Sequence, residues 1–387
     1  MHNAKNPSRP TPLQPCALTG AGMALEGIRG AVALINGPTG CKFYTAALVD
    51  AQDPREENLS PERFSDLLHF GQPRVPCTTL QQEDIIYGSE AKLRSALQQL
   101  KSRYPEHLVG IVNTCALSLI GEDLQGVSRE FVGQGEQVVH MESSGFTGGL
   151  AAGFQQMCRT LVREIMRSPR EKCPRSVNLV GPMIGHYNWR NDINELKRML
   201  GMLGIGINAV ITAGASLQEM IEAPKAALNA VVYEEYGETV AREMEERFGL
   251  PWVGTNGFAP YGLRNTALWL RQVAQALGID VEGPLQEEIE TISRRVFPYL
   301  ARYLGGGALK GLPVAVCADG SVALALADFL AEYLGMDPVL LGVKTAGPGV
   351  EELVRRLSEE HSAEPLVLWE PDLEEVAEGL RKTAPEL

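Results

Sequence analysis

The sequence predicts an α/β fold with parallel sheets. Short apolar segments typical of buried strands alternate with longer amphipathic segments typical of helices. This alternation places helices on both faces of a parallel sheet. The apolar content of 44% and the charged content of 21% are those of a globular protein. A chain of 387 residues is too long for one ordinary core, so we expect two or three domains.

The alternation is clearest from Ser176 to about residue 254. The predicted strands there are "SVNLVG", "INAVIT", "NAVVY" and "LPWVG", and the predicted helices are "NDINELKRMLGML", "LQEMIEA" and "GETVAREMEERFG". Asp192 with Glu195, and Ser216 with Glu219, have the spacing of a capping box, so we expect a helix to begin at each pair.

The remaining segments follow the same pattern less evenly. Residues 261–304 read as two successive helices, and "GGG" at 305–307 reads as a flexible break before a further α/β unit that begins with "LPVAVCADG". Before Ser176, "LEGIRGAVALING" reads as a helix running into a strand. "HLVGIVNTC" is a strand with Cys115 at its carboxyl end, where ligands gather in open α/β sheets.

Charge and composition exclude several classes of function. A formal net charge of −13 argues against binding to a nucleic-acid backbone. The proline-containing stretch 1–14 has no apolar core of a secretory signal, and we expect it to form an extended arm. No apolar run reaches the ~18–20 residues that span a bilayer. We therefore expect a soluble, cytoplasmic protein.

Three of the seven cysteines stand in contexts that favour metal binding. Cys16, Cys41 and Cys115 each lie next to a turn or a strand end, where backbone N–H groups are free. Iron–sulfur clusters need thiolate ligands and nearby N–H donors. Gly37 and Gly40 would allow the backbone to approach a bulky cluster closely. The alternative is that all three are buried structural cysteines.

The glycine-rich stretches do not match nucleotide-binding loops. A phosphate-binding loop has the pattern G-x-x-x-x-G-K-[ST], whereas Gly37, Gly40 and Lys42 have another spacing and Phe43 stands at the Ser/Thr position. In "GAGMALEG", Leu25 occupies the third glycine position of a dinucleotide fingerprint. Nucleotide binding by this chain is not expected.

The other cysteines and one histidine are secondary candidates. Cys77 could be a fourth ligand, but a buried thiol is the favoured interpretation. Cys158 and Cys317 are expected to pack in the core, and Cys173 is expected to be a free thiol. His186 follows a predicted strand end beside Tyr187, Trp189 and Arg190, and it either contacts a substrate or lies on a surface loop.

Four stretches, in their order and spacing, resemble the nitrogenase component 1 superfamily. They are "PCALTGAGMALEGIRGAVALINGPTGC", "QQEDIIYGSEAKL", "VNTCALSLIGEDL" and "ESSGFTGG". The superfamily includes nitrogenase subunits, cofactor-assembly paralogues, dark-operative protochlorophyllide reductases and the reductive cyclase of a nickel tetrapyrrole. The resemblance covers roughly Pro15 to Leu387.

The resemblance implies three Rossmann-like domains, with boundaries that we expect at 15–175, 176–304 and 305–387. It implies that Cys16, Cys41 and Cys115 match the three cysteines that each subunit supplies to an iron–sulfur cluster at a subunit interface. Gly40 would then border the cofactor. It also implies an ATP-hydrolysing reductase as partner, and a paired subunit that forms a homodimer or a heterodimer with a paralogue. A small-molecule substrate, such as a tetrapyrrole, would be reduced.

Two departures from the family pattern qualify these expectations. The chain has no cysteine between Cys173 and Cys317, and after His186 its one histidine is His361, in the surface-like stretch "SEEHSAEP". Neither Cys317 nor His361 resembles the cysteine and the histidine that hold the nitrogenase cofactor. Dinitrogen reduction by this chain alone is therefore not expected. We also expect a third domain that is shorter than in the longer members, either as a compact natural variant or as a truncated form. With three cysteines, a 4Fe–4S cluster needs a fourth ligand from elsewhere, or two chains share a larger cluster. No catalytic residue is identified from the sequence.

Overall fold

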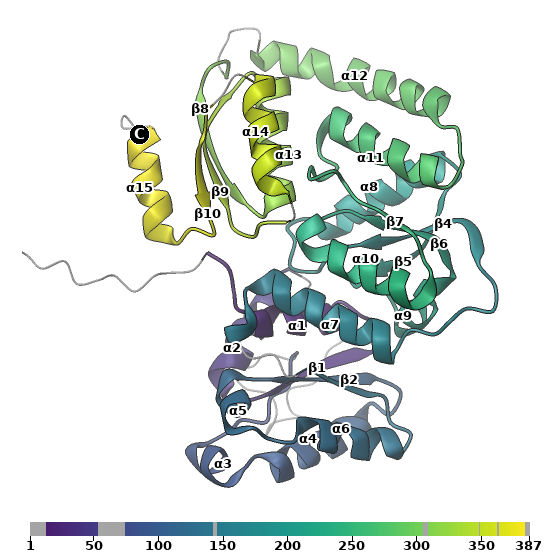
Figure 1. Ribbon diagram of the computed structural model, residues 1–387, viewed down its shortest axis with the longest axis vertical. Coiled ribbons are helices and arrows are strands. Elements are labelled where there is room, and N and C mark those ends of the chain that lie inside the picture. The colour runs from purple at the N-terminus through teal and green to yellow at the C-terminus, as the bar shows by residue number, and fades with distance from the viewer. Residues whose placement is uncertain are drawn as a thin grey trace, which may run out of the picture. The chain divides into compact units, whose positions relative to one another are not determined.

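The computed structural model describes residues 13–52, 74–141, 145–304, 309–347, 349–361 and 364–383. The chain divides into two compact units. The N-terminal unit comprises 15–232 and 236–253, and the C-terminal unit comprises 1–14, Tyr233–Glu235 and 254–387. All strand pairs in the three described sheets are parallel, which confirms the predicted fold class (Figure 1). Most of the predicted N-terminal arm and the break at 305–307 lie outside the described residues.

The first sheet of the N-terminal unit has the order β1-β2-β3, with β1 at Ala31–Asn36, β2 at Leu108–Asn113 and β3 at Val138–Met141. Strands β1 and β2 are buried along their whole length, because helices cover both faces of the sheet. Helices α4 (Glu90–Arg103) and α6 (Leu124–Gly133) pack on one face, and α1 (Ala17–Glu26) and α7 (Leu150–Glu164) lie on the other (Figure 1).

Helices α1 and α7 approach each other at two glycines. A Cβ atom on Gly20 would lie 1.9 Å from the backbone oxygen of Leu150, and one on Gly153 would lie 1.8 Å from that of Ala17. Any side chain at either position would force the helices apart. The close packing of α1 on α7 therefore explains why a glycine stands at position 20, the first residue of "GAGMALEG".

The second sheet of the N-terminal unit has the order β5-β4-β6-β7. Its strands are β4 (Cys173–Val180), β5 (Gly206–Ile211), β6 (Ala226–Val231) and β7 (Trp252–Val253). Its helices are α8 (Trp189–Met202), α9 (Leu217–Glu222) and α10 (Glu234–Phe248). Arg159 and Arg163 of α7 pair with Glu243 of α10, so ion pairs join the helices of the two sheets.

The structure confirms one of the two predicted capping boxes. Ser216 caps α9 in a capping box with Glu219. The box at Asp192 was wrong, because α8 begins earlier, with Asn188 as its N-cap residue in the left-handed conformation. Asp192 lies in the first turn of α8 and accepts a hydrogen bond from the Asn188 side chain at 3.2 Å.

The C-terminal unit holds a third sheet of order β10-β9-β8, with β8 at Pro313–Ala318, β9 at Asp337–Val343 and β10 at Leu366–Trp369. The expected successive helices are present as α11 (Gly262–Ala276) and α12 (Glu282–Leu304), and α13 (Gly320–Leu334), α14 (Val350–His361) and α15 (Leu373–Thr383) follow. Cys317 was expected in the core but is exposed, because β8 is an edge strand. Among the described helices, none is long and apolar enough to cross a membrane.

Candidate metal centre

The three predicted ligand cysteines lie at the start of three different helices of the N-terminal unit. Cys16 is the N-cap residue of α1, Cys41 lies in the first turn of α2 (Thr39–Gln52), and Cys115 is the first residue of α5 (Cys115–Ile120). The first N–H groups of a helix have no intrahelical acceptor and form the positive end of its dipole. N–H groups at such positions can donate hydrogen bonds to sulfur.

Cys41 lies close enough to the other two cysteines for their charges to act on it. Burial raises the pKa of the Cys41 thiol, and the negative charges of Cys16 and Cys115 raise this pKa further. The structure thus places two thiols from distant segments of the chain near Cys41, although the three sulfur atoms do not all lie within 4.8 Å of one another. None of the three cysteines forms a disulfide bond with another described residue. Three thiolates at these positions would repel one another, and a cation among the sulfur atoms would stabilise the deprotonated set.

Buried side chains hold the loops that carry Cys41 and Cys115. Asn36 and Asn113 end β1 and β2, face each other in register, and share a hydrogen bond of 3.1 Å from Asn36 Nδ2 to Asn113 Oδ1. Thr78 Oγ1 donates to Asn36 Oδ1 at 2.9 Å and accepts from the Gly37 N–H at 3.0 Å. Sequence reasoning missed this network, because its members come from three separate segments.

The backbone of Gly148 and Gly149 holds the segment that carries Cys16. The N–H of Ala17 donates to the carbonyl oxygen of Gly148 at 3.0 Å, and Cys16 forms an isolated antiparallel bridge with Gly149. These glycines belong to the "ESSGFTGG" stretch, of which residues 142–144 lie outside the described residues. The stretch therefore contributes to the cysteine site through its backbone.

Gly37 and Gly40 differ in their surroundings. A Cβ atom on Gly37 would lie 2.1 Å from Cγ2 of Thr114, so the contact with Thr114 explains this glycine. Gly40 is exposed, and a Cβ atom there would have nothing within 4 Å among the described residues. The expected clearance for a cofactor at Gly40 stays a prediction.

Two further buried groups lie behind the Cys41 loop. Cys77 is fully buried, donates to the Gly37 carbonyl oxygen at 3.1 Å and accepts from the Thr79 N–H at 3.3 Å. Burial raises the pKa of Cys77 to about 11, which agrees with the favoured interpretation of a protonated, packed thiol. Lys42, also fully buried, has a pKa lowered to about 8 by burial. No pattern in the sequence indicated that Lys42 is buried.

Exposed apolar side chains lie on the helices that carry Cys41 and Cys115, on a helix that contacts α5, and on the short helix that precedes Gly148. They come from α2, α3 (Gln82–Tyr87), α5 and the short helix Gly145–Thr147, and we call them the apolar rim. Tyr44 is 70% exposed, Tyr87 86% and Leu119 75%. Apolar groups gathered in this way mark interaction surfaces. The apolar rim consists of Phe43, Tyr44, Ile85, Ile86, Tyr87, Leu119, Ile120 and Phe146.

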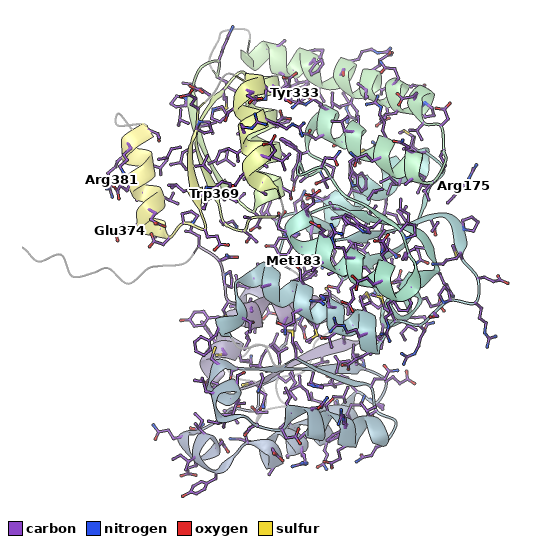
Figure 2. The ribbon with its side chains drawn as sticks, viewed as in Figure 1. Arg175, Met183, Tyr333, Trp369, Glu374 and Arg381 are labelled. Atoms are coloured by element: carbon purple, nitrogen blue, oxygen red, sulfur yellow. The ribbon has the colours of Figure 1, made fainter. Side chains whose placement is uncertain are left out.

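His186 is oriented by the protein. It follows β4, and its Nδ1 accepts a hydrogen bond of 3.2 Å from the N–H of Met183, which is labelled in Figure 2. Its ring meets that of Tyr236 edge to face, with centroids 4.9 Å apart. Tyr187 is 88% exposed, whereas Trp189 is buried. Contact with a substrate stays a prediction for His186.

The remaining cysteines outside the site match their predicted surroundings apart from Cys317. Cys158 is buried in α7, and burial raises its pKa. Cys173 is exposed and free at the start of β4. These two thiols are natural controls for any experiment on the cysteine site.

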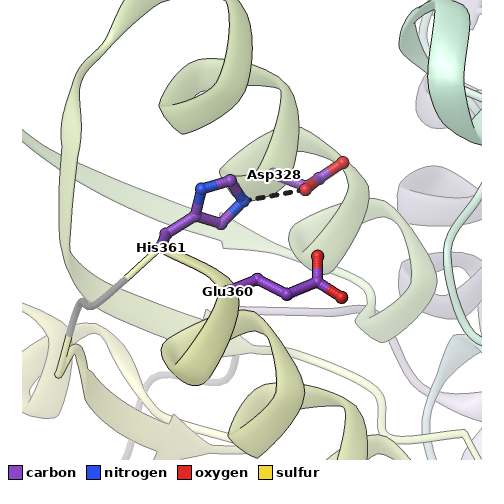
Figure 3. Close-up of side chains that lie close together, drawn as sticks. All are labelled: Asp328, Glu360 and His361. Atoms are coloured by element: carbon purple, nitrogen blue, oxygen red, sulfur yellow. Dashed lines mark hydrogen bonds and ion pairs between the residues drawn. The ribbon is translucent and has the colours of Figure 1, made fainter.

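A second group of ligand-type side chains lies in the C-terminal unit (Figure 3). Ligand atoms of Asp328, Glu360 and His361 all lie within 4.8 Å of one another. However, the Arg264 guanidinium pairs with Asp328 and, at 3.1 Å, with Glu360. His361 Nε2 lies 2.9 Å from Asp328 Oδ1, and the Asn265 amide donates to Oδ2 at 2.8 Å. A cation of the protein already pairs with both carboxylates of this group, and His361 is not the surface residue that its sequence context indicated.

Comparison with known proteins agrees with these features. The family model described as "Nitrogenase component 1 type Oxidoreductase" matches residues 16–387. The chain belongs to this family. Its fold matches a solved structure described as "Nitrogenase Cp1 at pH 6.5", with a TM-score of 0.77 at 18% identity, over 97% of this chain and 80% of that chain.

Family members whose descriptions name different functions are about equally similar to this chain. The nitrogenase iron-molybdenum cofactor biosynthesis protein NifE of Clostridium pasteurianum is 25% identical, over 89% of this chain and 71% of its own length. The nitrogenase molybdenum-iron protein alpha chain of Methanococcus maripaludis is 25% identical, over 96% and 78%. A light-independent protochlorophyllide reductase component from Prochlorococcus marinus is also 25% identical, over 86% and 64%. Identity therefore does not choose among these roles.

Proposed function

We propose that this chain is the iron–sulfur subunit of a nitrogenase-like, two-component reductase. Cys16, Cys41 and Cys115 would be the cluster ligands. The observation that supports this most directly is the convergence of three thiols from three helix starts, close enough for two of them to raise the pKa of the third. A bound iron–sulfur cluster would supply one-electron transfer.

The donor set fits such a cluster. Iron–sulfur clusters take thiolate ligands and are tuned by nearby hydrogen-bond donors. The three cysteines offer thiolates, and the helix starts offer N–H groups. The site is open on one side, since Cys16 and Gly40 are exposed. A fourth ligand to a 4Fe–4S cluster, or three more thiolates to a larger one, can enter from that side.

The apolar rim supports a paired subunit. A second copy of the chain or a paralogue would cover side chains such as Tyr44, Tyr87 and Leu119. Such a partner would close the open side of the cysteine site and could bring the missing ligands. A symmetric dimer presents the same patch twice, so two sets of three cysteines would face each other.

Electrons would come from a separate ATP-hydrolysing iron–sulfur reductase, as the family resemblance implies. The final acceptor would be an unsaturated small molecule, with a tetrapyrrole as one candidate. The protochlorophyllide reductase among the relatives supports this class of substrate.

A second function is supported by other relatives. Two similar proteins, from Clostridium pasteurianum and Methanosarcina barkeri, are described as iron-molybdenum cofactor biosynthesis proteins. The chain could accordingly be a scaffold on which a metal cofactor is assembled. Turnover separates the two functions: a reductase converts substrate with ATP and its partner, whereas a scaffold releases a metal cluster to an acceptor protein.

Iron and sulfide analysis of anaerobically purified protein tests the cluster assignment. We expect iron and acid-labile sulfide in the natural protein and in Cys173→Ala, whose exposed thiol is the matched control. Cys41→Ala should lose both. A natural protein that takes up no iron after reconstitution, or a Cys41→Ala variant with full iron content, would contradict the proposal.

A further inference from the structure

Among the described residues, the buried polar side chains at the carboxyl ends of β1 and β2 have hydrogen-bond partners, with the exception of Thr114. Asn36, Asn113, Thr78 and the Gly37 N–H form the hydrogen-bonded network that holds the cysteine loops. Thr114 is also buried, but its Oγ1 has no hydrogen-bond partner among the residues that the structure describes. Native proteins rarely leave a buried hydroxyl in this state, so it requires a physical explanation.

The local geometry makes the orphaned hydroxyl of Thr114 more unusual. Thr114 is the N-cap residue of α5, where a threonine side chain normally accepts a hydrogen bond from the first turn of its helix. No such bond is formed here. The side chain packs instead on Gly37, since a Cβ atom there would lie 2.6 Å from Oγ1. The hydroxyl thus lies between the loop that leads to Cys41 and the backbone of Cys115.

We infer that the Thr114 hydroxyl donates a hydrogen bond to a sulfur atom of the cluster held by Cys41 and Cys115. This inference rests on the proposed function. A hydroxyl is both donor and acceptor, and sulfur in a cluster accepts hydrogen bonds from nearby donors. The bond would satisfy the hydroxyl when the cluster is bound. Thr114 would then be a positioning and tuning residue of the site.

A hydrogen bond from Thr114 would raise the midpoint potential of the cluster. A cluster carries more negative charge when it is reduced, so a hydrogen-bond donor stabilises the reduced form more than the oxidised form. Loss of the donor should therefore shift the midpoint potential of the cluster to a more negative value. Thr114→Val removes the hydroxyl at nearly constant shape, and Thr114→Ser retains it.

Thr212 supplies a matched control. Its Oγ1 is likewise buried without a partner in the described part of the chain, but it follows β5 of the second sheet. The natural protein, Thr114→Val, Thr114→Ser and Thr212→Val would be purified anaerobically, checked for iron and sulfide, and titrated for their midpoint potentials. We expect a more negative potential in Thr114→Val alone. Equal potentials in all four proteins would overturn the inference.

The iron content of the natural protein and of the variants distinguishes a failure of the proposed function from a failure of the inference about Thr114. If the natural protein binds no iron, the proposed function fails before Thr114 is tested. If Thr114→Val loses iron while Thr114→Ser and Thr212→Val retain it, the hydroxyl is needed at the site, as inferred. If both Thr114 variants lose iron, the side chain acts through packing and the inference is wrong.

The metal-free protein gives a readout that does not depend on a cluster. With no partner to lose, metal-free Thr114→Val should unfold at the same temperature as the metal-free natural protein, or at a higher one. A clearly lower unfolding temperature would show that the hydroxyl already has a partner without the cluster. That result would also overturn the inference.

Discussion

The cysteine site of the N-terminal unit and the Asp328 group of the C-terminal unit both gather metal-type ligands, but their charges are balanced differently. Asp328 and Glu360 are paired with the Arg264 guanidinium, and Asn265 and His361 bond Asp328 as well. The thiol of Cys41 instead experiences burial and two like charges, all of which raise its pKa. Proximity of ligand atoms is therefore not enough to identify a metal site, because at the Asp328 group a side-chain cation already pairs with the carboxylates.

Removal of Arg264 should produce the largest change in stability. Asp328 is buried, with a side chain 1% exposed, and Arg264→Gln would leave its charge without the guanidinium. Because Arg264 is itself 36% exposed, we expect a loss of about 2–4 kcal/mol in the free energy of unfolding, with iron content unchanged. Arg294→Gln, which breaks an exposed pair on α12, is the control and should cost about 0.5 kcal/mol or less. Equal losses in the two variants would refute the assigned role of Arg264.

Glu235 is a second buried carboxyl of the C-terminal unit, and its pKa is raised. It accepts from the Ser321 N–H and hydroxyl, and its pKa is raised to about 7 by burial and by the charge of Asp319. The folded state therefore holds a proton that the unfolded state releases between its ordinary pKa of 4.5 and pH 7. Stability from this group is fully present below pH 4.5 and is lost as pH rises through about 7.

We expect Glu235→Gln to remove this pH dependence. The free energy of unfolding of the variant, relative to that of the natural protein, should rise by on the order of 2–3 kcal/mol between pH 4.5 and pH 8. Denaturant unfolding at a series of pH values measures the difference. A constant difference across this range would contradict the raised pKa of Glu235.

Two asparagine pairs test whether the loop network serves the cysteine site. Asn36 and Asn113 end their strands, whereas Asn178 and Asn229 form the same register pair within β4 and β6, joined by a hydrogen bond of 2.9 Å. Asn113→Leu and Asn229→Leu should each lose about 1–3 kcal/mol of stability, because each leaves a buried amide unsatisfied. We expect Asn113→Leu alone to lose iron. Similar iron content in the two variants would contradict the proposal that Asn36 and Asn113 support metal binding at the cysteine site.

Substitution of two glycines distinguishes a glycine required for packing within the protein, Gly37, from one that would leave space for a cofactor, Gly40. Gly37→Ala should destabilise even the metal-free protein by about 1–3 kcal/mol, because its Cβ atom would collide with Thr114. Gly40→Ala should leave metal-free stability within about 0.5 kcal/mol, as its Cβ atom meets nothing among the described residues. If Gly40 borders the cofactor, Gly40→Ala should still lower the iron content. Unchanged iron in Gly40→Ala would remove Gly40 from the predicted site.

The sequence predicted the features that depend on local pattern. The strands other than β3, the successive helices α11 and α12 and the capping box at Ser216 follow from periodicity and spacing, and the structure confirms them. Strand β3 was not predicted. The box at Asp192 was wrong because Asn188, in a left-handed conformation, starts α8 four residues earlier. Cys317 was placed in the core because a mid-strand position does not reveal that β8 is an edge strand.

The features of the site that sequence reasoning missed depend on tertiary contacts. The burial of Lys42, the pairing of Asn36 with Asn113 and the orphaned hydroxyl of Thr114 arise between segments far apart in the chain. His361 looked like a surface residue because its neighbours in sequence are polar, yet Asp328 on another helix contacts it. Such contacts leave no periodic signal in the residues themselves.

The Mössbauer spectrum of protein reconstituted anaerobically with ⁵⁷Fe and sulfide tests the central claim most directly. The proposal predicts sulfur-coordinated cluster iron in the natural protein and in His361→Gln, and its loss in Cys41→Ala. A spectrum without cluster iron in the natural protein would contradict it. Iron coordinated by oxygen and nitrogen that survives Cys41→Ala but disappears in His361→Gln would place the metal at the Asp328 group instead.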